Sequence, residues 1–194
     1  MVSVRTIYGI GVNDAGYVVA PIIDGKQVMC PYYSTWSSMF FRCYSQTNLK
    51  NNPCYIGCSV SDKWHKFSDF KLWMESQDWR GKVLDKDLLV FGNKTYSPET
   101  CVFIDERVNL FIADKNRGKY LNGVYLCKTT GKFRGRVHNL EGKAVCLGRF
   151  LLEDDAHSAW IKAKKQFAEQ LAAMQSDIRV AKALTERYNH YGFS

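Results

Sequence analysis

Asp85 and Asn109 are the residues of this sequence best suited to hold a divalent cation. Asp85 ends a short apolar stretch that is typical of a strand, and Asn109 lies in an apolar stretch typical of a helix. A carboxylate and a side-chain amide both supply hard oxygen donors, which suit Mg²⁺ or Mn²⁺ when water and a phosphate fill the remaining positions. We therefore expect a Mg²⁺ or Mn²⁺ site at this pair.

Three elements must position these two side chains. Residues 82–112 predict two strands and a helix, separated by a polar loop. The first strand is expected to end at Leu84-Asp85, the second to cover residues 101–104, and Asp105 to cap the helix. In such a ββα unit, the end of the first strand and the first turns of the helix can converge on one small ion. The alternative is an ordinary charged turn followed by an exposed asparagine.

This stretch resembles the His-Me finger of HNH homing endonucleases, particularly the phage-encoded kind. Aligned on that motif, Asp85 and Asn109 match its two metal-binding residues, and Thr100 falls at its structural Asn. Lys86 falls at the position of its general-base His. The resemblance implies metal-dependent cleavage or nicking of double-stranded DNA, with Asp85, Lys86 and Asn109 as the catalytic residues.

Lys86 is the main departure from this family. A general base should titrate near neutrality, as His does, whereas an ammonium group has an unperturbed pKa of about 10.4. Lys86 works as a base if a metal and burial lower its pKa, or it clamps the transition-state phosphate; otherwise the site has lost its chemistry and kept phosphate binding. We expect Asp87 and Asn93 to support Lys86.

The positive charge of the chain is concentrated in one segment. The 194 residues carry a formal net charge of +8. Lys and Arg balance Asp and Glu in residues 1–114 and again in residues 150–194. Residues 115–149, beginning with Lys115 and Arg117, contain the whole excess, with Glu141 as their single acid. A focused block of this kind attracts polyanions, although a solvated basic surface is the alternative.

The same segment has the pattern of a three-stranded sheet backed by a helix. The strand-like stretches GVYLC, KFRGRVH and AVCLGRF are separated by turns and followed by the amphipathic stretch 154–174. Period-two alternation in the middle stretch directs Phe133 and Val137 toward the helix. The outward side chains of that stretch are then Lys132, Arg134, Arg136 and His138.

This half resembles the DNA-binding domain of plant ethylene-response factors, the Apetala-two domain, which phages also carry appended to HNH endonucleases. The matching features are Gly123-Val124, residues 131–133, residues 147–150 and a helix that begins near Asp154. The family's DNA contacts fall at Tyr125, Cys127, Arg136 and His138. Because Cys127, Arg136 and Cys146 differ from the family's Arg, Glu and Trp, we expect another DNA sequence to be read. The expected DNA-binding residues are Tyr125, Lys128, Lys132, Arg134, Arg136, His138 and Arg149.

The amino-terminal part predicts a small antiparallel hairpin or meander, followed by helices with aromatic core residues. Turns are expected at Asn13-Asp14 and Asp24-Gly25. The stretches 32–45, with Ser34 as its cap, and 61–74 place aromatic residues at helical spacing.

Two weaker signals in this part concern cofactors. The segment GIGVNDAG lacks the third glycine and the following helix of a dinucleotide fingerprint, so we expect no nucleotide cofactor. Cys43, Cys54 and Cys58 lack the paired spacings and the histidine of a typical zinc site, and whether any cysteine binds zinc stays open.

Together these patterns predict an α+β protein of two domains. Residues 1–114 are expected to form an HNH-like nuclease-type domain, and residues 115–194 a basic DNA-binding domain that ends in a helix. The whole chain resembles early or middle-region proteins of short-tailed lytic coliphages, which implies double-stranded DNA as the partner and the host cytoplasm as the location. No apolar run approaches the roughly 18 residues of a membrane span, and the first residues do not have the pattern of a signal peptide. We therefore expect no membrane partner.

Three functions are compatible with the sequence. The first is an HNH-type DNA endonuclease, and the second is a catalytically inactive DNA-binding protein with a regulatory or anti-host role. The third is an interaction module whose basic face meets an acidic protein. The DNA target, the number of strands cut and the oligomeric state are left open by the sequence.

Overall fold

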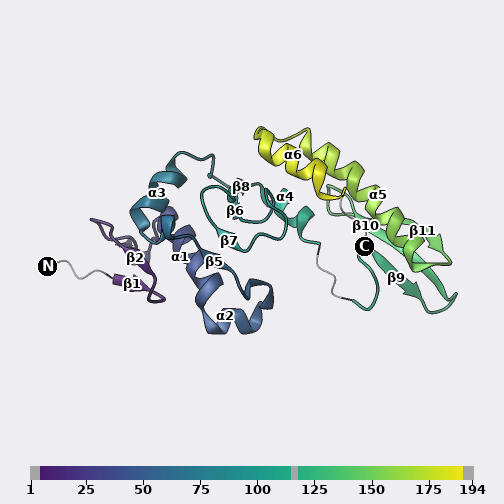
Figure 1. Ribbon diagram of the computed structural model, residues 1–194, viewed down its shortest axis with the longest axis horizontal. Helices are drawn as coiled ribbons and strands as arrows, with labels where there is room; N and C mark the ends of the chain where they lie inside the picture. Colours follow the sequence, from purple (N-terminus) through teal and green to yellow (C-terminus); the bar gives the residue numbers. More distant parts are fainter. Residues whose placement is uncertain (1–4, 115–117, 190–194) are drawn as a thin grey trace. The chain divides into compact units, whose positions relative to one another are not determined.

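The computed structural model describes residues 5–114 and 118–189, which form a mixed α+β protein with small sheets and a C-terminal helix (Figure 1). This fold class was predicted. The chain divides into two compact units, Met1–Ile104 and Asp105–Ser194. The second unit therefore begins with helix α4 (Glu106–Ile112), whereas the predicted domain division follows that helix.

The core of the first unit is built around α1 (Pro31–Tyr44), which buries Trp36, Met39, Phe40 and Cys43. This stripe was predicted, but the cap at Ser34 was wrong, because Pro31 occupies the start of the helix. Proline suits that position since its missing N–H would have no partner there. The short α2 (Gln46–Asn51) follows, and the side chain of its cap, Ser45, accepts a hydrogen bond from the N–H of Asn48.

The second aromatic stretch is divided between two helical elements. A 3-10 turn, η2 (Asp62–Trp64), precedes α3 (Phe67–Glu75). The indole N–H of Trp36 donates to the backbone oxygen of Trp64 at 2.8 Å, which satisfies the polar atom of a fully buried ring. A further 3-10 turn, η1 (Pro53–Tyr55), lies between α2 and the strand at Ser59–Val60.

Two separate hairpins precede these helices. Strands β1 (Arg5–Ile7) and β2 (Gly11–Asn13) pair antiparallel, as do β3 (Ile22–Ile23) and β4 (Lys26–Gln27). The expected turn at Asp24-Gly25 is present, and both residues have positive φ, as a type I′ turn requires. The hairpin turn expected at Asn13-Asp14 lies instead at Tyr8 and Gly9, with φ of 53° and 70°. At Asn13 the chain makes only a local side-chain turn, in which Oδ1 accepts a hydrogen bond from the N–H of Ala15 at 3.2 Å.

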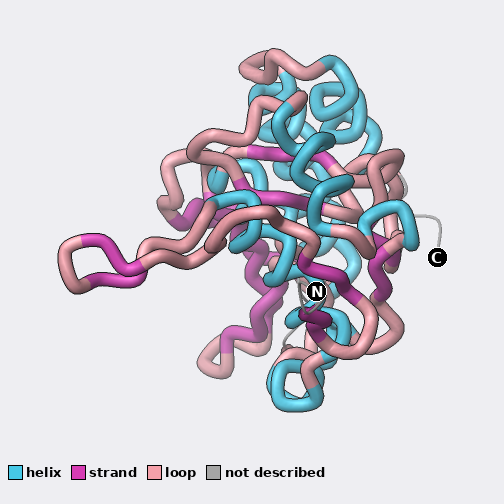
Figure 2. The backbone as a smooth tube through the Cα atoms, turned by 90° about the vertical axis from the view of Figure 1, so that its left-hand side faces the viewer, coloured by secondary structure: helices cyan, strands magenta, loops and turns pink. Residues whose placement is uncertain are grey.

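Two small sheets complete the first unit. β5 (Ser59–Val60) pairs parallel with β7 (Thr95–Tyr96). β6 (Val83–Asp85) pairs antiparallel with β8 (Val102–Ile104), and Asp85 lies opposite Val102. The two strands predicted on either side of the polar loop are thus present and paired. Short elements joined by loops are visible along the backbone in Figure 2.

The second unit contains the predicted three-stranded sheet. β9 (Val124–Cys127), β10 (Lys132–His138) and β11 (Ala144–Phe150) are antiparallel, with β10 in the centre. The long helix α5 (Glu153–Ala172) packs on this sheet, and α6 (Ile178–Arg187) packs on α5. Val137 and Trp160 lie in the core between sheet and helix, where they are 3% and 5% exposed.

Buried polar contacts tie the end of α4 to the helices of the second unit. The ammonium group of Lys164 lies 2.8 Å from a carboxylate oxygen of Asp114, and these side chains are only 7% and 8% exposed. Tyr188 donates its hydroxyl to the same carboxylate, and Arg187 donates to the backbone oxygen of Ile112 at 2.8 Å. Within residues 5–114 and 118–189, no helix is both long and apolar enough to cross a membrane.

Candidate functional site

Asp85 lies at the end of β6, where it shapes the turn that follows. Its Oδ1 atom accepts hydrogen bonds from the backbone N–H groups of Asp87 and Leu88, at 2.9 and 2.6 Å. Burial and the nearby charge of Asp87 raise the pKa of the Asp85 carboxyl above its usual value, although the two N–H groups oppose this rise.

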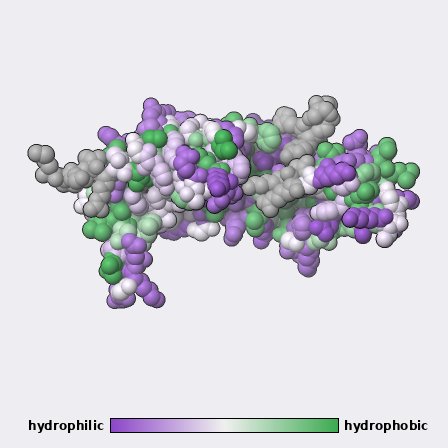
Figure 3. Space-filling model, turned by 90° about the horizontal axis from the view of Figure 1, so that it is seen from below, coloured by the Kyte–Doolittle hydropathy of each residue, from purple (hydrophilic) through white to green (hydrophobic). Residues whose placement is uncertain are grey.

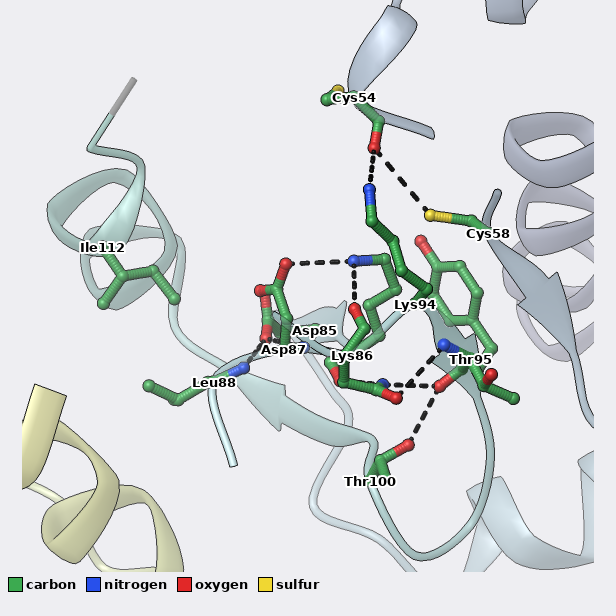
Figure 4. A network of polar contacts seen from close by, with 12 residues as sticks. Cys54, Cys58, Asp85, Lys86, Asp87, Leu88, Lys94, Thr95, Thr100 and Ile112 are labelled. Carbon is green, nitrogen blue, oxygen red and sulfur yellow. Dashed lines mark hydrogen bonds and ion pairs between the residues drawn. The ribbon is translucent and has the colours of Figure 1, made fainter. Parts of the chain in front are cut away.

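Lys86 is held by two oxygen atoms, as Figure 4 shows. Its ammonium group lies 3.0 Å from a carboxylate oxygen of Asp87 and 3.1 Å from the backbone oxygen of Asn93. Burial alone would lower the pKa of Lys86, but the hydrogen bond and charge of Asp87 outweigh it and raise that pKa. This environment keeps Lys86 protonated, which favours a charged clamp over a base.

Asn93 holds together the loop between β6 and β8. Its side-chain amide donates to the backbone oxygens of Lys86 and Thr95, at 2.6 and 2.7 Å. Thr100, which falls at the family's structural Asn, bonds through its hydroxyl to the same Thr95 oxygen at 3.0 Å. The amide that crosses the loop is therefore supplied by Asn93, and Thr100 only assists.

Asn109 lies on α4, where it is partly buried and its backbone N–H donates to the oxygen of Asp105 at 3.0 Å. Asp85 belongs to the first unit and Asn109 to the second, so a shared metal ion stays a prediction. Within the part of the chain that the structure describes, no three His, Cys, Asp or Glu side chains gather as a metal site.

The expected alternation of β10 is present in the structure. Lys132, Arg134, Arg136 and His138 are exposed, whereas Gly135 and Val137 are buried toward α5. Tyr125 on β9 lies opposite Arg134, on the same face, and is 46% exposed. Lys128 is exposed in the turn between β9 and β10, while Lys115 and Arg117 lie outside the described residues.

A β-bulge brings Arg149 of β11 onto this face. Arg149 lies opposite Arg134, and Cys146 lies opposite Arg136. Leu147, between them, is the extra residue that the register shift leaves unpaired. We call the exposed side of this sheet the outer basic face, and its side chains are Tyr125, Cys127, Lys132, Arg134, Arg136, His138, Cys146 and Arg149.

Tyr125 and Arg136 form a preorganised pair on the outer basic face. The guanidinium of Arg136 donates to the Tyr125 hydroxyl at 3.0 Å and lies 4.6 Å from the centre of its ring. A planar guanidinium oriented in this way can meet a phosphate or a base edge with less loss of side-chain entropy. Hydrophilic side chains are interspersed with apolar ones over the surface drawn in Figure 3.

Two further basic side chains, which were not predicted as site residues, line a cleft together with residues of this face. A cleft of about 320 Å³ in the second unit is lined by Arg107 and Lys164 together with Arg136 and His138. Arg107 is exposed on α4, and no pattern in the sequence connects that helix with the sheet. Lys164 follows Trp160 by one helical turn, and that spacing was the available signal for its burial.

Comparisons with protein-family models, with curated proteins and with solved structures found no match for this chain.

Proposed function

We propose that this protein binds double-stranded DNA through the outer basic face. The observation that carries the proposal is the direct opposition of Arg134 and Arg149 on neighbouring strands. Like charges in opposing positions destabilise a sheet, and an anion between the two guanidinium groups removes that cost. The resemblance of this half to the Apetala-two domain adds support.

The arrangement favours a polyanion with regularly spaced charges over a single small anion. Basic side chains extend along β10 from Lys132 to His138, and Arg149 adds one further cation on β11. The phosphates of duplex DNA follow one another along a groove that admits a β-sheet, so such a row can make several contacts at once.

Salt dependence of binding tests this proposal. For B-form DNA, the logarithm of the binding constant falls with the logarithm of salt by about 0.9 per neutralised phosphate. The double variant Arg134→Ala/Arg136→Ala should flatten this slope by about two if both side chains contact phosphates. Lys162→Ala/Lys165→Ala is the matched control, since it removes the same charge from α5 and should change the slope little.

Two results would overturn the proposal. The first is no binding to duplex DNA in dilute buffer. The second is an equal change of slope in both double variants, because the position of the charge would then not matter. Binding to an acidic protein alone, with no affinity for DNA, would support the interaction module instead.

Metal-dependent DNA cleavage is the second candidate function. It is supported by the position of Asp85, whose carboxylate is oriented by two backbone N–H groups at the end of β6. Asp85 and Asn109 would hold a Mg²⁺ or Mn²⁺ ion that supplies Lewis-acid chemistry at a phosphate. Lys86 would add a positive charge beside it, in the role of a clamp.

Nicking of supercoiled plasmid DNA in the presence of Mg²⁺ or Mn²⁺ tests this second function. Asp85→Ala and Asn109→Ala should each abolish nicking, whereas Glu99→Ala, which removes an exposed acid of the same unit, should leave it intact. Nicking that persists in EDTA or in Asp85→Ala would refute the metal site. Duplex binding without any nicking would favour the catalytically inactive alternative, and Lys86→His then tests whether an imidazole restores activity.

A further inference from the structure

Two thiols share the outer basic face with the arginines. Cys127 on β9 lies opposite Lys132, and Cys146 on β11 lies opposite Arg136. Both cysteines line one hollow of about 280 Å³, and Arg134 belongs to the same lining. A reagent of a few atoms or a short peptide chain can therefore approach both sulfur atoms from the side on which we place DNA.

The surroundings of Cys127 favour the thiolate. Hydrogen bonds from Thr129 and Thr130 lower the pKa of the Cys127 thiol to about 6. The Thr129 hydroxyl lies 3.2 Å from the sulfur atom, and Lys132 is the cationic side chain opposite it. At neutral pH most Cys127 side chains are then ionised, and the thiolate is the reactive form of cysteine.

The surroundings of Cys146 also favour its thiolate. A hydrogen bond from the backbone of Gly148 lowers the pKa of its thiol, and the positive charges of Arg134 and Arg149 act in the same direction. Cys146 is exposed. Cys127 is partly buried but lines the same hollow. Both thiols therefore combine a route of approach with ionisation, and these two properties together make a cysteine reactive.

The buried cysteines of the first unit provide the contrast. Cys43 and Cys101 are 4% and 0% exposed, and burial raises the pKa of each thiol to about 12. Cys58 is also buried. Cys54 is exposed and belongs to the first unit. It therefore serves as an accessible cysteine whose rate of modification can be compared with those of Cys127 and Cys146.

We propose that Cys127 and Cys146 form a modification site for low-molecular-weight disulfides such as glutathione disulfide, and that the adducts release DNA from the outer basic face. The site itself follows from the positions of the two cysteines, whereas the effect on DNA rests on the proposed function. The modification is a reversible one, since a reducing thiol restores the protein.

The reaction is a thiol–disulfide exchange. The thiolate of Cys127 attacks one sulfur of the glutathione disulfide, so a new S–S bond joins the cysteine to one glutathione. The original S–S bond breaks, and the second glutathione leaves as a thiolate that takes a proton from water. One disulfide is consumed and one thiol is released per modified cysteine, and no other oxidant takes part.

The bulk of the adduct determines its effect on binding. A glutathionyl group is a tripeptide with two carboxylates and one ammonium, and at Cys127 it would stand beside Lys132 on the face proposed for DNA. Methyl methanethiosulfonate instead attaches only S–CH₃ and removes a thiolate charge from a basic surface. We therefore expect glutathione to weaken DNA binding at least tenfold and the methylthio group to leave it unchanged or stronger.

The first part of the test does not involve DNA. The folded protein is incubated with glutathione disulfide at pH 7.5, and each cysteine peptide is examined by mass spectrometry over time. Cys127 and Cys146 should be modified first, Cys54 more slowly, and Cys43 and Cys101 only after unfolding. Modification of Cys54 before both sheet cysteines, or equal rates at all exposed cysteines, would overturn the modification site.

The second part measures duplex affinity before and after glutathione treatment. The wild-type protein and Cys54→Ser should lose duplex affinity on treatment with glutathione disulfide and regain it after reduction with dithiothreitol. The duplex affinity of Cys127→Ser/Cys146→Ser should change in neither step. Adducts at both cysteines with unchanged duplex affinity would overturn the regulatory claim. If the untreated protein binds no duplex, the proposed function fails, while the mass-spectrometric result still decides whether the modification site exists.

Discussion

The side-chain amide of Asn93 donates to the backbone oxygen of Lys86 at 2.6 Å, while the ammonium of Lys86 donates to the backbone oxygen of Asn93 at 3.1 Å. These reciprocal bonds connect the two ends of the loop that leaves β6. Lys86 is 8% exposed, so few water molecules can replace a bond that is lost there. This pair therefore adds a cross-loop connection to the hydrogen bonds that Asp85 and Thr100 make in the same loop.

Replacing Asn93 with alanine should destabilise the first unit by about 1–3 kcal/mol, because the partly buried carbonyl of Lys86 loses its amide donor and that of Thr95 keeps only the Thr100 hydroxyl. Thermal or denaturant unfolding measures this loss. Asn51→Ala is the control, since Asn51 is exposed at the end of α2 and its replacement should change stability by less than about 0.5 kcal/mol. Equal effects of the two variants would contradict the role assigned to Asn93.

Because Lys164 and Asp114 form a buried ion pair, we expect the effects of replacing them on the free energy of unfolding to depend strongly on each other. Lys164→Met should cost about 3–5 kcal/mol of unfolding free energy, because it leaves the carboxylate buried without its cation. Asp114→Asn leaves an uncompensated ammonium and should also destabilise. In a double-mutant cycle, the combined variant should lose less than the sum of the two single losses.

Lys162→Met is the matched control for that cycle, since Lys162 is an exposed lysine of the same helix. It should change stability by less than about 0.5 kcal/mol. Additive losses in the Lys164 and Asp114 variants would mean that the two charges do not stabilise each other.

Gly123 is required by both its backbone conformation and its surroundings. Its φ is +77°, and a Cβ atom there would lie 2.0 Å from the Cδ1 atom of Trp160. Gly123→Ala should therefore combine about 1–2 kcal/mol of left-handed strain with about 1–3 kcal/mol for displacing the indole. Gly131→Ala, at φ +65° with open space around it, should show the strain alone. Chemical unfolding of both variants measures the difference.

The reactivity of Cys127 should depend on pH in a defined direction. Because its thiol has a pKa of about 6, the thiolate is nearly complete at pH 7.5 and is lost as the pH falls through 6. The rate of alkylation by iodoacetamide should thus fall about tenfold between pH 7.5 and pH 5. An ordinary thiol, with a pKa of about 8.5, would still gain reactivity above pH 7.5. Peptide mass spectrometry follows Cys127 separately from the other cysteines.

Local patterns predicted the longer elements of this fold, but not α2 or the parallel pair of β5 and β7. The alternation from Lys132 to His138 predicted which side chains of β10 face solvent, since successive side chains of a strand point to opposite faces. The aromatic spacing around Trp36 predicted the buried stripe of α1. Cap and turn positions were predicted less well: α1 begins at Pro31, before Ser34, and the first hairpin turns at Tyr8 and Gly9.

Non-local pairing determined the features that local patterns missed. The sequence by itself established a concentrated positive charge, a three-stranded sheet and the alternation of its central strand. Only the tertiary structure placed Arg149 opposite Arg134, because a bulge at Leu147 changes which residues of β11 share a face. Only packing buried Lys164, since a lysine on an apolar helix face is stable there when a distant carboxylate, Asp114, meets it.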